Sequence, residues 1–276
     1  MEEEKPVAES NSAKSSVTAH EDYFANLDFS KLAVSIEDMF KSGVHFGHSK
    51  SRKNPRMDEY IYAVRKNISI IDLQKTVEKL KEAMAFLSEK AAAGEEILFV
   101  GTKKQAKDLV EAAAKACKEP YVKERWLGGT FTNFKVLSER ARFLREGQEK
   151  MEKGEFAKYT KFEKMKIAQE LERLEKKMGG IKEMRKLPGA VFVAGTIEDA
   201  LAIKEAEIKG VPVVALVDSN ADLRGVDYPI PSNDDAVSSL KIMLSYIVKA
   251  VLEGKSKMKI VADKKTNDSE LKDKQQ

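Results

Sequence analysis

Apolar residues along the chain alternate between short unbroken runs and runs with helical spacing. The unbroken runs 97–100, 190–194 and 211–217 are rich in Val, Ile, Leu and Phe, which is typical of buried parallel strands. The first two each end in Gly-Thr and lead into a segment with apolar residues at helical spacing. Strands alternating with helices predict βαβ units and an α/β fold with a parallel sheet. Right-handed crossovers would place helices on both faces of that sheet.

Further elements are predicted on either side of these units. A short helix is expected over 34–41, with Ser35 as its cap, and a short strand over 68–71. A long helix should follow from Asp72 until Gly94 ends it. A final long helix should run from the cap at Asn233 to about Glu253.

The section from 134 to 186 interrupts the alternation. Its heptad positions are spaced 4-3-4-3 at Leu137, Ala141, Leu144, Gln148 and Met151, and again at Ile167, Leu171, Leu174, Met178 and Ile181. Two such seams separated by Gly154 predict an antiparallel coiled-coil hairpin inserted into the sheet domain. An arm of about 18 residues per helix would reach roughly 27 Å. The arm either holds a partner or is a structural insert.

Charge is unevenly distributed, which changes the expected class of partner. Residues 1–30 carry a net charge of −5, and the rest of the chain carries +9. A basic body favours nucleic acid or another polyanion. We predict an acidic disordered extension over 1–33, an α/β domain over 34–254 interrupted by the hairpin at 134–186, and a Lys-rich flexible tail over 255–276.

The single cysteine, Cys117, cannot form an internal disulfide, which favours the reducing cytoplasm. The first residues contain no apolar run, so no signal peptide is expected. No stretch of about 18 apolar residues predicts a membrane span.

The most unusual stretch is Gly43–Met57, which contains two Gly, two His, two Lys and two Arg. We interpret it as a loop that lies against phosphate, since Gly permits unusual backbone angles and Asn54-Pro55 predicts a turn at its end. An ordinary basic surface loop is the alternative, and this stretch alone does not decide between them. The candidate phosphate-binding side chains are His45, His48, Lys50, Arg52, Lys53 and Arg56, with Lys103 and Lys104 at a predicted helix N-terminus in second rank.

The sequence reveals no group for catalysis and predicts no cofactor. Neither a Walker-type phosphate loop nor a dinucleotide-binding glycine motif follows any predicted strand. His45 and His48 are three residues apart, but no third metal ligand is evident, so we expect hydrogen-bonding or phosphate-facing histidines and no metal. We therefore predict that the protein is not an enzyme.

The second unusual stretch is Arg125–Phe134, which joins an apparent strand over 121–126 to the arm. It contains Trp126, the only tryptophan, beside a cation and a pair of glycines. Trp126 either stacks on a base, as aromatic side chains do in RNA sites, or fills the sheet at the root of the arm.

With both stretches in hand, the chain resembles the bacterial family of ribosomal small-subunit protein two over roughly residues 34–254. The motifs that carry the resemblance are Gly43–His48 with Asn54-Pro55, Ile97–Lys103, Arg125–Thr130 with Thr132-Asn133, Leu171-Glu172 through Gly179–Lys182, Leu187-Pro188, and Pro212 with Val217–Asn220, Gly225–Tyr228, Ile230-Pro231 and Asn233–Ala236. Several long motifs in order are far more specific than any one of them.

The resemblance implies a flavodoxin-like or Rossmann-like sheet domain with an inserted antiparallel coiled coil. It also implies a non-catalytic structural component of the small ribosomal subunit, which supports translation. The implied partners are small-subunit ribosomal RNA and other small-subunit proteins, including the large mRNA-binding one where an organism has it.

The chain departs from that family in three places. Lys53 stands where the family often has an aromatic residue before Asn-Pro, which favours a phosphate contact over stacking there. Gly195 stands where the family often ends a strand with an acid, and the acidic residues 1–30 have no evident counterpart.

Two rival hypotheses stay open on the sequence. The first is a cytoplasmic α/β protein that binds a phosphorylated small molecule at Gly101-Thr102 and Asp218, on the carboxyl edge of the sheet. The second is a ribosomal-type fold recruited as an interaction module that acts through its arm.

Overall fold

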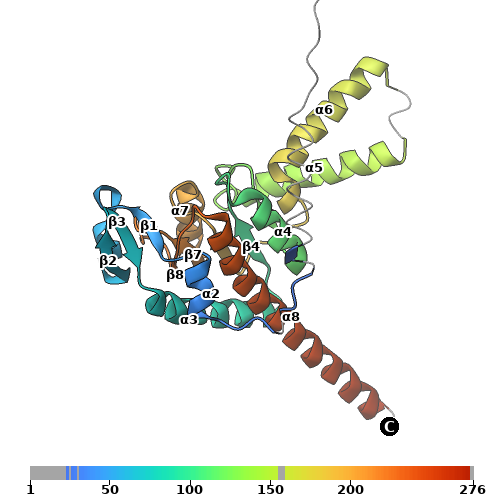
Figure 1. The fold of residues 1–276 in the computed structure, drawn as a ribbon. Coiled ribbons are helices and arrows are strands. Elements are labelled where there is room, and N and C mark those ends of the chain that lie inside the picture. The colour runs from blue at the N-terminus through green and yellow to red at the C-terminus, as the bar shows by residue number, and fades with distance from the viewer. Residues whose placement is uncertain (1–22, 25, 30, 155–158, 274–276) are drawn as a thin grey trace, which may run out of the picture.

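A five-stranded parallel sheet forms the centre of the molecule, of which the computed structural model describes residues 23–273 except 25, 30 and 155–158 (Figure 1). Its strands are β4 (Ile97–Val100), β5 (Tyr121–Val122), β6 (Ala190–Val193), β7 (Val213–Val217) and β8 (Tyr228–Pro231). Their order across the sheet is β5-β4-β6-β7-β8, and every pair is parallel. Numbered along the chain this is the order 2-1-3-4-5 of flavodoxin-like folds, which confirms the predicted α/β class.

Helices cover both faces of this sheet, as predicted. On one face, α3 (Leu73–Ala92), α4 (Lys107–Cys117) and α8 (Val237–Asp273) pack against side chains such as Phe99 and Phe192. On the other face, α7 (Ala200–Lys209) and the base of the arm pack against Leu98 and Val100, because alternate residues of a strand point to opposite faces.

A second, three-stranded antiparallel sheet lies beside the first. It contains β1 (Phe46–Ser49), β2 (Ile61–Arg65) and β3 (Ile68–Ile71) in the order β1-β3-β2. The prediction of a loop over 43–57 was therefore wrong in part, since β1 and two short 3-10 helices, η1 (Lys50–Arg52) and η2 (Pro55–Tyr60), occupy it. β1 has no alternation of buried and exposed residues, and its backbone bonds come from a distant partner, β3.

The ends of the helices follow the sequence signals in most places. Ser35 accepts a hydrogen bond at the start of α2 (Ile36–Lys41), and Asp72 does the same for α3. The end predicted at about Glu253 was wrong, because α8 continues to Asp273. Residues beyond 253 lack apolar periodicity, but they are rich in Lys, Asp and Glu, of which Lys and Glu are good helix formers.

The start of α4 also differs from the prediction. The helix begins at Lys107, so Lys103 and Lys104 lie in the turn that precedes it. The carbonyl oxygen of Lys103 accepts hydrogen bonds from the N–H groups of Ala106 and Lys107, at 2.8 and 3.0 Å. These bonds close the turn before the first helical residue.

The arm consists of α5 (Phe134–Glu152), α6 (Lys161–Met178) and the short 3-10 helix η4 (Gly179–Ile181). Its seam packs near the body, where Leu144 and Leu171 are buried and Gln148 donates to Glu175 at 2.8 Å. Met151, further out, is exposed, and Figure 1 shows the two helices splayed apart away from the body. The helical hairpin is present, and coiled-coil packing along its whole length stays a prediction.

The N-terminal extension is described only from Tyr23. Phe24 is buried in the same core cluster as side chains of α8, and the hydroxyl groups of Tyr23 and Ser245 lie 3.4 Å apart. Most of the predicted disordered segment, residues 1–22, lies outside the described residues.

Candidate nucleic-acid interface

The segment 43–57 meets the motifs at 217–220 and 233–236 at the carboxyl edge of the parallel sheet. The N–H of Asn233 donates to the carbonyl oxygen of Val44 at 3.0 Å, and its side-chain amide donates to that of Gly43 at 3.1 Å. The N–H of Asn54 donates to the carbonyl oxygen of Ser219 at 2.9 Å. These bonds fix the segment 43–54 against the loops that follow β7 and β8.

Gly47 permits this close approach. The N–H of the next residue, His48, donates to the Ser219 hydroxyl at 2.7 Å. A Cβ atom at position 47 would lie 2.7 Å from that same hydroxyl oxygen and 3.1 Å from the carbonyl oxygen of Ser69. The second glycine of the motif is therefore required by packing between the two sheets.

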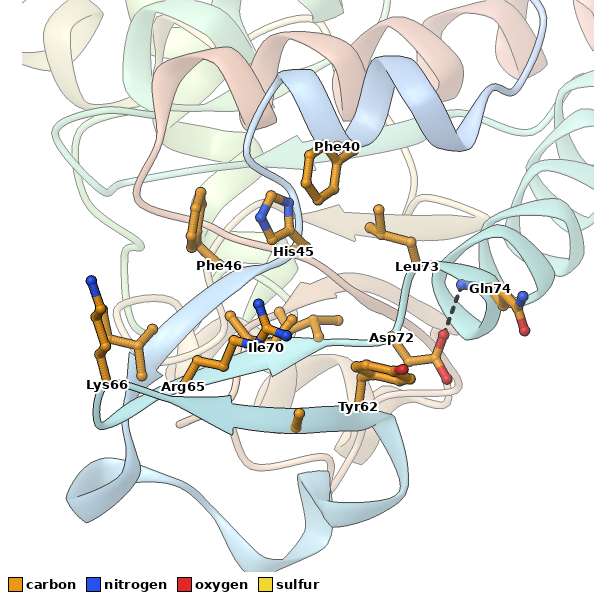
Figure 2. A pocket seen from close by; sticks show the side chains of 13 residues that line it. Phe40, His45, Phe46, Tyr62, Arg65, Lys66, Ile70, Asp72, Leu73 and Gln74 are labelled. Atoms are coloured by element: carbon orange, nitrogen blue, oxygen red, sulfur yellow. Dashed lines mark hydrogen bonds between the residues drawn. The ribbon is translucent and has the colours of Figure 1, made fainter.

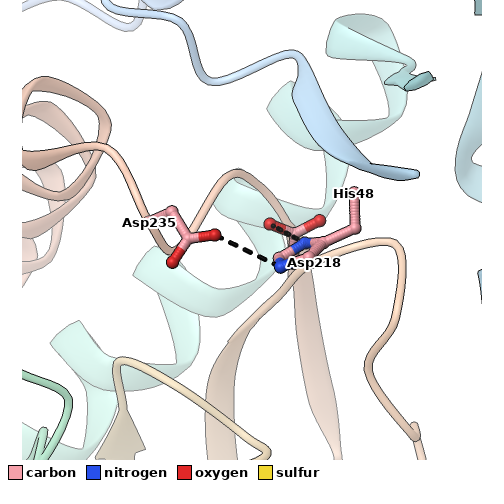
Figure 3. A group of neighbouring side chains, drawn as sticks. All are labelled: His48, Asp218 and Asp235. Carbon is pink, nitrogen blue, oxygen red and sulfur yellow. Dashed lines mark ion pairs between the residues drawn. The ribbon is translucent and has the colours of Figure 1, made fainter. Parts of the chain in front are cut away.

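His48 bridges two carboxylates, as Figure 3 shows. Its Nδ1 lies 3.2 Å from Asp218 Oδ2, and its Nε2 lies 3.2 Å from Asp235 Oδ2. The hydrogen bond to Asp218 raises the pKa of His48, and the charges of Asp235 and Asp234 add to this, although partial burial of the ring acts the other way. A protonated imidazole matches this pair of acceptors.

Lys103 joins the same cluster from the turn after β4. Its ammonium lies 2.7 Å from Asp234 Oδ1 and 2.7 Å from Asp235 Oδ1. Burial works to lower the pKa of Lys103, but the bonds to these two carboxylates raise it. Burial raises the pKa of Asp234 to about 6, even though Lys103 opposes that shift.

Three side chains here are able to hold a divalent cation, namely those of His48, Asp218 and Asp235. One ligand atom from each lies within 4.8 Å of the other two. His45, the second histidine of the motif, is not part of this group. The carboxylates already have internal partners in His48 and Lys103. The expectation that no metal binds here stays a prediction.

His45 faces a different surface, an apolar pocket of about 780 Å³ beside the three-stranded sheet (Figure 2). Its ring stacks on Phe40 at 4.3 Å between centroids and lies 4.1 Å from the ring of Phe46. Burial lowers the pKa of His45. Phe40, Phe46 and Tyr62 are exposed around this pocket, and Arg65 also lines it.

The remaining predicted cations differ in their exposure to solvent and in whether they form an ion pair. Lys50, Arg52, Arg56 and Lys104 are exposed, and none forms an ion pair within the part of the chain that the structure describes. Lys53 is half-buried and pairs with Asp58 at 2.5 Å. The eight predicted residues are therefore four exposed cations and four side chains with internal contacts.

Trp126 fills the root of the arm, so the plug interpretation is confirmed. The indole is 5 % exposed and donates to Glu205 Oε1 at 3.2 Å. The same carboxylate accepts the backbone N–H groups of Gly129, Phe131 and Thr132 at 2.7, 2.9 and 3.2 Å. Burial alone would raise the pKa of Glu205, but these hydrogen bonds outweigh it, so the pKa of Glu205 is lowered.

A small-molecule phosphate site at Gly101-Thr102 finds little support in this geometry. The Thr102 N–H, which such a phosphate would need, donates to Asp199 Oδ2 at 3.1 Å. Burial raises the pKa of Asp199 to about 6. Asp218 and Asp234 are also buried at this edge, and acidic side chains of this density disfavour a phosphate.

Sequence reasoning missed the carboxylate partners of His48, and it missed the role of Glu205 at the root of the arm. Asp235 was part of the motif Asn233–Ala236 but was given no partner, and Glu205 lies inside an apolar helix pattern. A usable signal was available for the first group, because the carboxyl ends of β7 and β8 meet at one edge of a parallel sheet. No local signal marked Glu205, whose donors come from a turn more than 70 residues earlier.

No helix within the described part of the chain has the length and apolarity needed to cross a membrane.

The sequence was also compared with known families and proteins, and the match spans the motifs described above. Residues 39–254 match the family described as Ribosomal protein S2. The chain is also 46 % identical over 224 residues to the small ribosomal subunit protein uS2 of Roseiflexus sp. (strain RS-1), covering 81 % of this chain and 86 % of that protein. The chain therefore belongs to the ribosomal protein S2 family.

Proposed function

We propose that the protein is a structural component of the small ribosomal subunit that binds small-subunit ribosomal RNA and neighbouring ribosomal proteins in the cytoplasm. Family membership supports the ribosomal role. The observation that carries the RNA-binding part is a group of exposed cations, without an ion pair among the described residues, on a segment that backbone bonds hold in place. Phosphate contacts of this kind position a protein without reading sequence.

Lys50, Arg52 and Arg56 are the proposed phosphate contacts. All three lie on or beside η1 and η2, and the Asx turn in which Arg56 N–H donates to Asn54 Oδ1 at 3.0 Å fixes the backbone there. Lys104 is a fourth contact, on the turn after β4. An ordered backbone reduces the entropy lost when these side chains meet RNA.

His45, His48, Lys53 and Lys103 support this surface from within. His48 and Lys103 neutralise the buried carboxylates at the sheet edge, and Lys53 pairs with Asp58 at the start of η2. Without these pairs the acidic side chains would repel phosphate. We propose that these four residues contribute to binding mainly by holding the segment and balancing its charge.

The protein-binding part of the proposal is supported by the apolar pocket beside the three-stranded sheet. Tyr62 is 77 % exposed there, and Phe40 and Phe46 also face solvent. Exposed aromatic side chains gathered around an apolar pocket favour a protein contact, whereas a phosphate contact needs cations and hydrogen-bond donors. We propose that another protein of the small subunit covers it.

The rRNA-binding proposal is tested by reversing charge at Arg52 and Arg56. A tagged Arg52→Glu/Arg56→Glu variant is produced in cells beside the untagged natural protein, and small subunits are isolated on a sucrose gradient. We expect the variant's share of the subunit-bound protein to fall on the order of tenfold relative to a tagged natural protein, since phosphate contacts carry much of the affinity.

Lys81→Glu/Lys118→Glu is the matched control. Both of these cations are exposed, on α3 and at the end of α4, away from the carboxyl edge of the sheet. Equal incorporation of both variants would contradict the role of the segment 50–56, whereas loss of the first variant alone supports it.

A further inference from the structure

We propose that the phosphate-binding surface extends beyond residues 50–56 onto two neighbouring turns, so that Lys66 and Arg224 contact phosphates of the same RNA. This inference rests on the proposed function, which assigns RNA contacts to Lys50, Arg52 and Arg56. Neither Lys66 nor Arg224 is singled out by the sequence, because each lies on a short turn of mixed composition.

The turn that carries Lys66 is tied directly to the first proposed contact. The N–H of Lys50 donates to the carbonyl oxygen of Asn67 at 2.9 Å, which places the β2–β3 turn against the start of η1. Lys66 and Asn67 have φ angles of 45° and 65°. Two successive residues with positive φ form the tight turn of a two-residue hairpin. The base of the Lys66 side chain is therefore held in a fixed place.

The loop that carries Arg224 is tied to the other end of the segment. The N–H of Asn54 donates to the carbonyl oxygen of Ser219 at 2.9 Å. Further along this loop, the hydrogen bond from the Arg224 side chain lowers the pKa of Asp222, and the charge of Arg56 adds to this shift. Arg224 and Arg56, which are 168 positions apart in the sequence, therefore lie close enough to act on one carboxylate.

Arg224 is exposed but oriented. Its Nε and Nη2 lie 2.7 and 2.6 Å from Asp222 Oδ2, and its side chain is 73 % exposed. A guanidinium has five N–H donors in a planar fork, so this pair leaves donors for a second acceptor. A held arginine loses less side-chain entropy when it binds a phosphate than a free one does.

The charge of three segments, namely residues 50–56, the turn at 66–67 and the loop 219–225, also fits a polyanion. Residues 50–66 carry six cationic and two acidic side chains. One of those acids, Asp58, already pairs with Lys53, and the acid of the third segment, Asp222, already pairs with Arg224. Through these backbone contacts both turns adjoin the segment that carries η1 and η2, and Lys66 also lines the apolar pocket beside it.

The test measures salt dependence with the full-length protein. Small subunits lacking this protein are titrated with the natural protein and with a Lys66→Gln/Arg224→Gln variant over a series of KCl concentrations. Each lost phosphate contact should make the slope of log K against log salt shallower by about 0.7 to 0.9. We expect the double variant to lose about 1.4 to 1.8 of slope in total, by the same relation.

Two further variants make every outcome informative. Lys81→Gln/Lys118→Gln, with exposed cations elsewhere, should keep the natural slope. Arg52→Gln/Arg56→Gln tests the proposed function itself. If only this last variant has a shallower slope, the extension to Lys66 and Arg224 is overturned and the proposed function stands.

Other outcomes separate the partners. Weaker binding of Lys66→Gln/Arg224→Gln with an unchanged slope would mean that these side chains contact a protein, and would overturn the inference. If no variant changes the slope, both the inference and the RNA-binding role of residues 50–56 fail.

Discussion

At the scale of single residues, the molecule uses buried charge to join segments that are distant in sequence. Glu205 on α7 accepts five hydrogen bonds from Trp126 and the turn that begins the arm: one from the indole, three from backbone N–H groups and one from the Thr132 hydroxyl. A carboxylate with several backbone donors is strongly favoured in its ionised form. Glu205 therefore fixes the root of the arm to the sheet domain.

Glu205→Gln should lower the free energy of unfolding at neutral pH by about 1.5 to 3 kcal/mol, the range for a hydrogen bond to a charged group. The hydrogen bonds depress the folded-state pKa of Glu205, so this stability is present above its ordinary pKa of 4.5 and is lost as pH falls through the depressed value. Denaturant unfolding at pH 7 and near pH 3 measures the difference.

The control for this prediction is Glu172→Gln, an exposed carboxylate on α6. It should change stability by less than about 0.5 kcal/mol at either pH. A gap between the natural protein and Glu205→Gln that stays constant with pH would contradict the assigned role.

Gly47→Ala tests the contact between the two sheets. The added methyl group would meet the Ser219 hydroxyl at 2.7 Å, so we expect a loss of about 1 to 3 kcal/mol in the free energy of unfolding. Gly128→Ala is the comparison, because the nearest atom to an added Cβ there is 3.9 Å away. Equal effects of the two substitutions on the melting temperature would disprove the steric argument.

At the scale of elements, local sequence pattern predicts several of the strands and the starts of the capped helices. Apolar runs predict the strands 97–100 and 68–71. N-cap residues predict the starts of α2 and α3. β1 was missed because its register depends on a partner strand about 20 residues away. The convergence of His48 with Asp218 and Asp235 was missed because strand order, which local pattern does not reveal, brings them together.

Leu171→Ala tests how far the arm depends on its own packing. Leu171 is buried where the arm meets the body, and a Cβ added at Gly147 on α5 would lie 2.6 Å from its side chain. We expect faster amide hydrogen exchange in α5 and α6, with β4, β6 and β7 still protected, since the cavity weakens only the interhelical contact. Phe162→Ala, at a 68 % exposed position, should leave exchange unchanged.

If Leu171→Ala instead accelerates exchange throughout the central sheet, the arm is part of the cooperative core. Its packing would then be required for the fold of the whole domain.

At the scale of the whole molecule, the exposed cations and exposed aromatic side chains share one region, while two buried carboxylates lie behind it. The cations of residues 50–66 and the exposed aromatic side chains around His45 lie on the three-stranded sheet and the segments attached to it. The buried carboxylates of Asp218 and Asp234 lie at the carboxyl edge of the parallel sheet, where His48 and Lys103 pair with them. Such an arrangement suits a scaffold that contacts RNA and protein at once.

The most direct test of this account is sedimentation of the protein from cell lysate through sucrose gradients at moderate and high salt. We predict that the protein migrates with the small ribosomal subunit and that the bound fraction falls as salt rises, because phosphate contacts weaken with salt. Migration only at the top of the gradient at every salt concentration would contradict a role in the subunit.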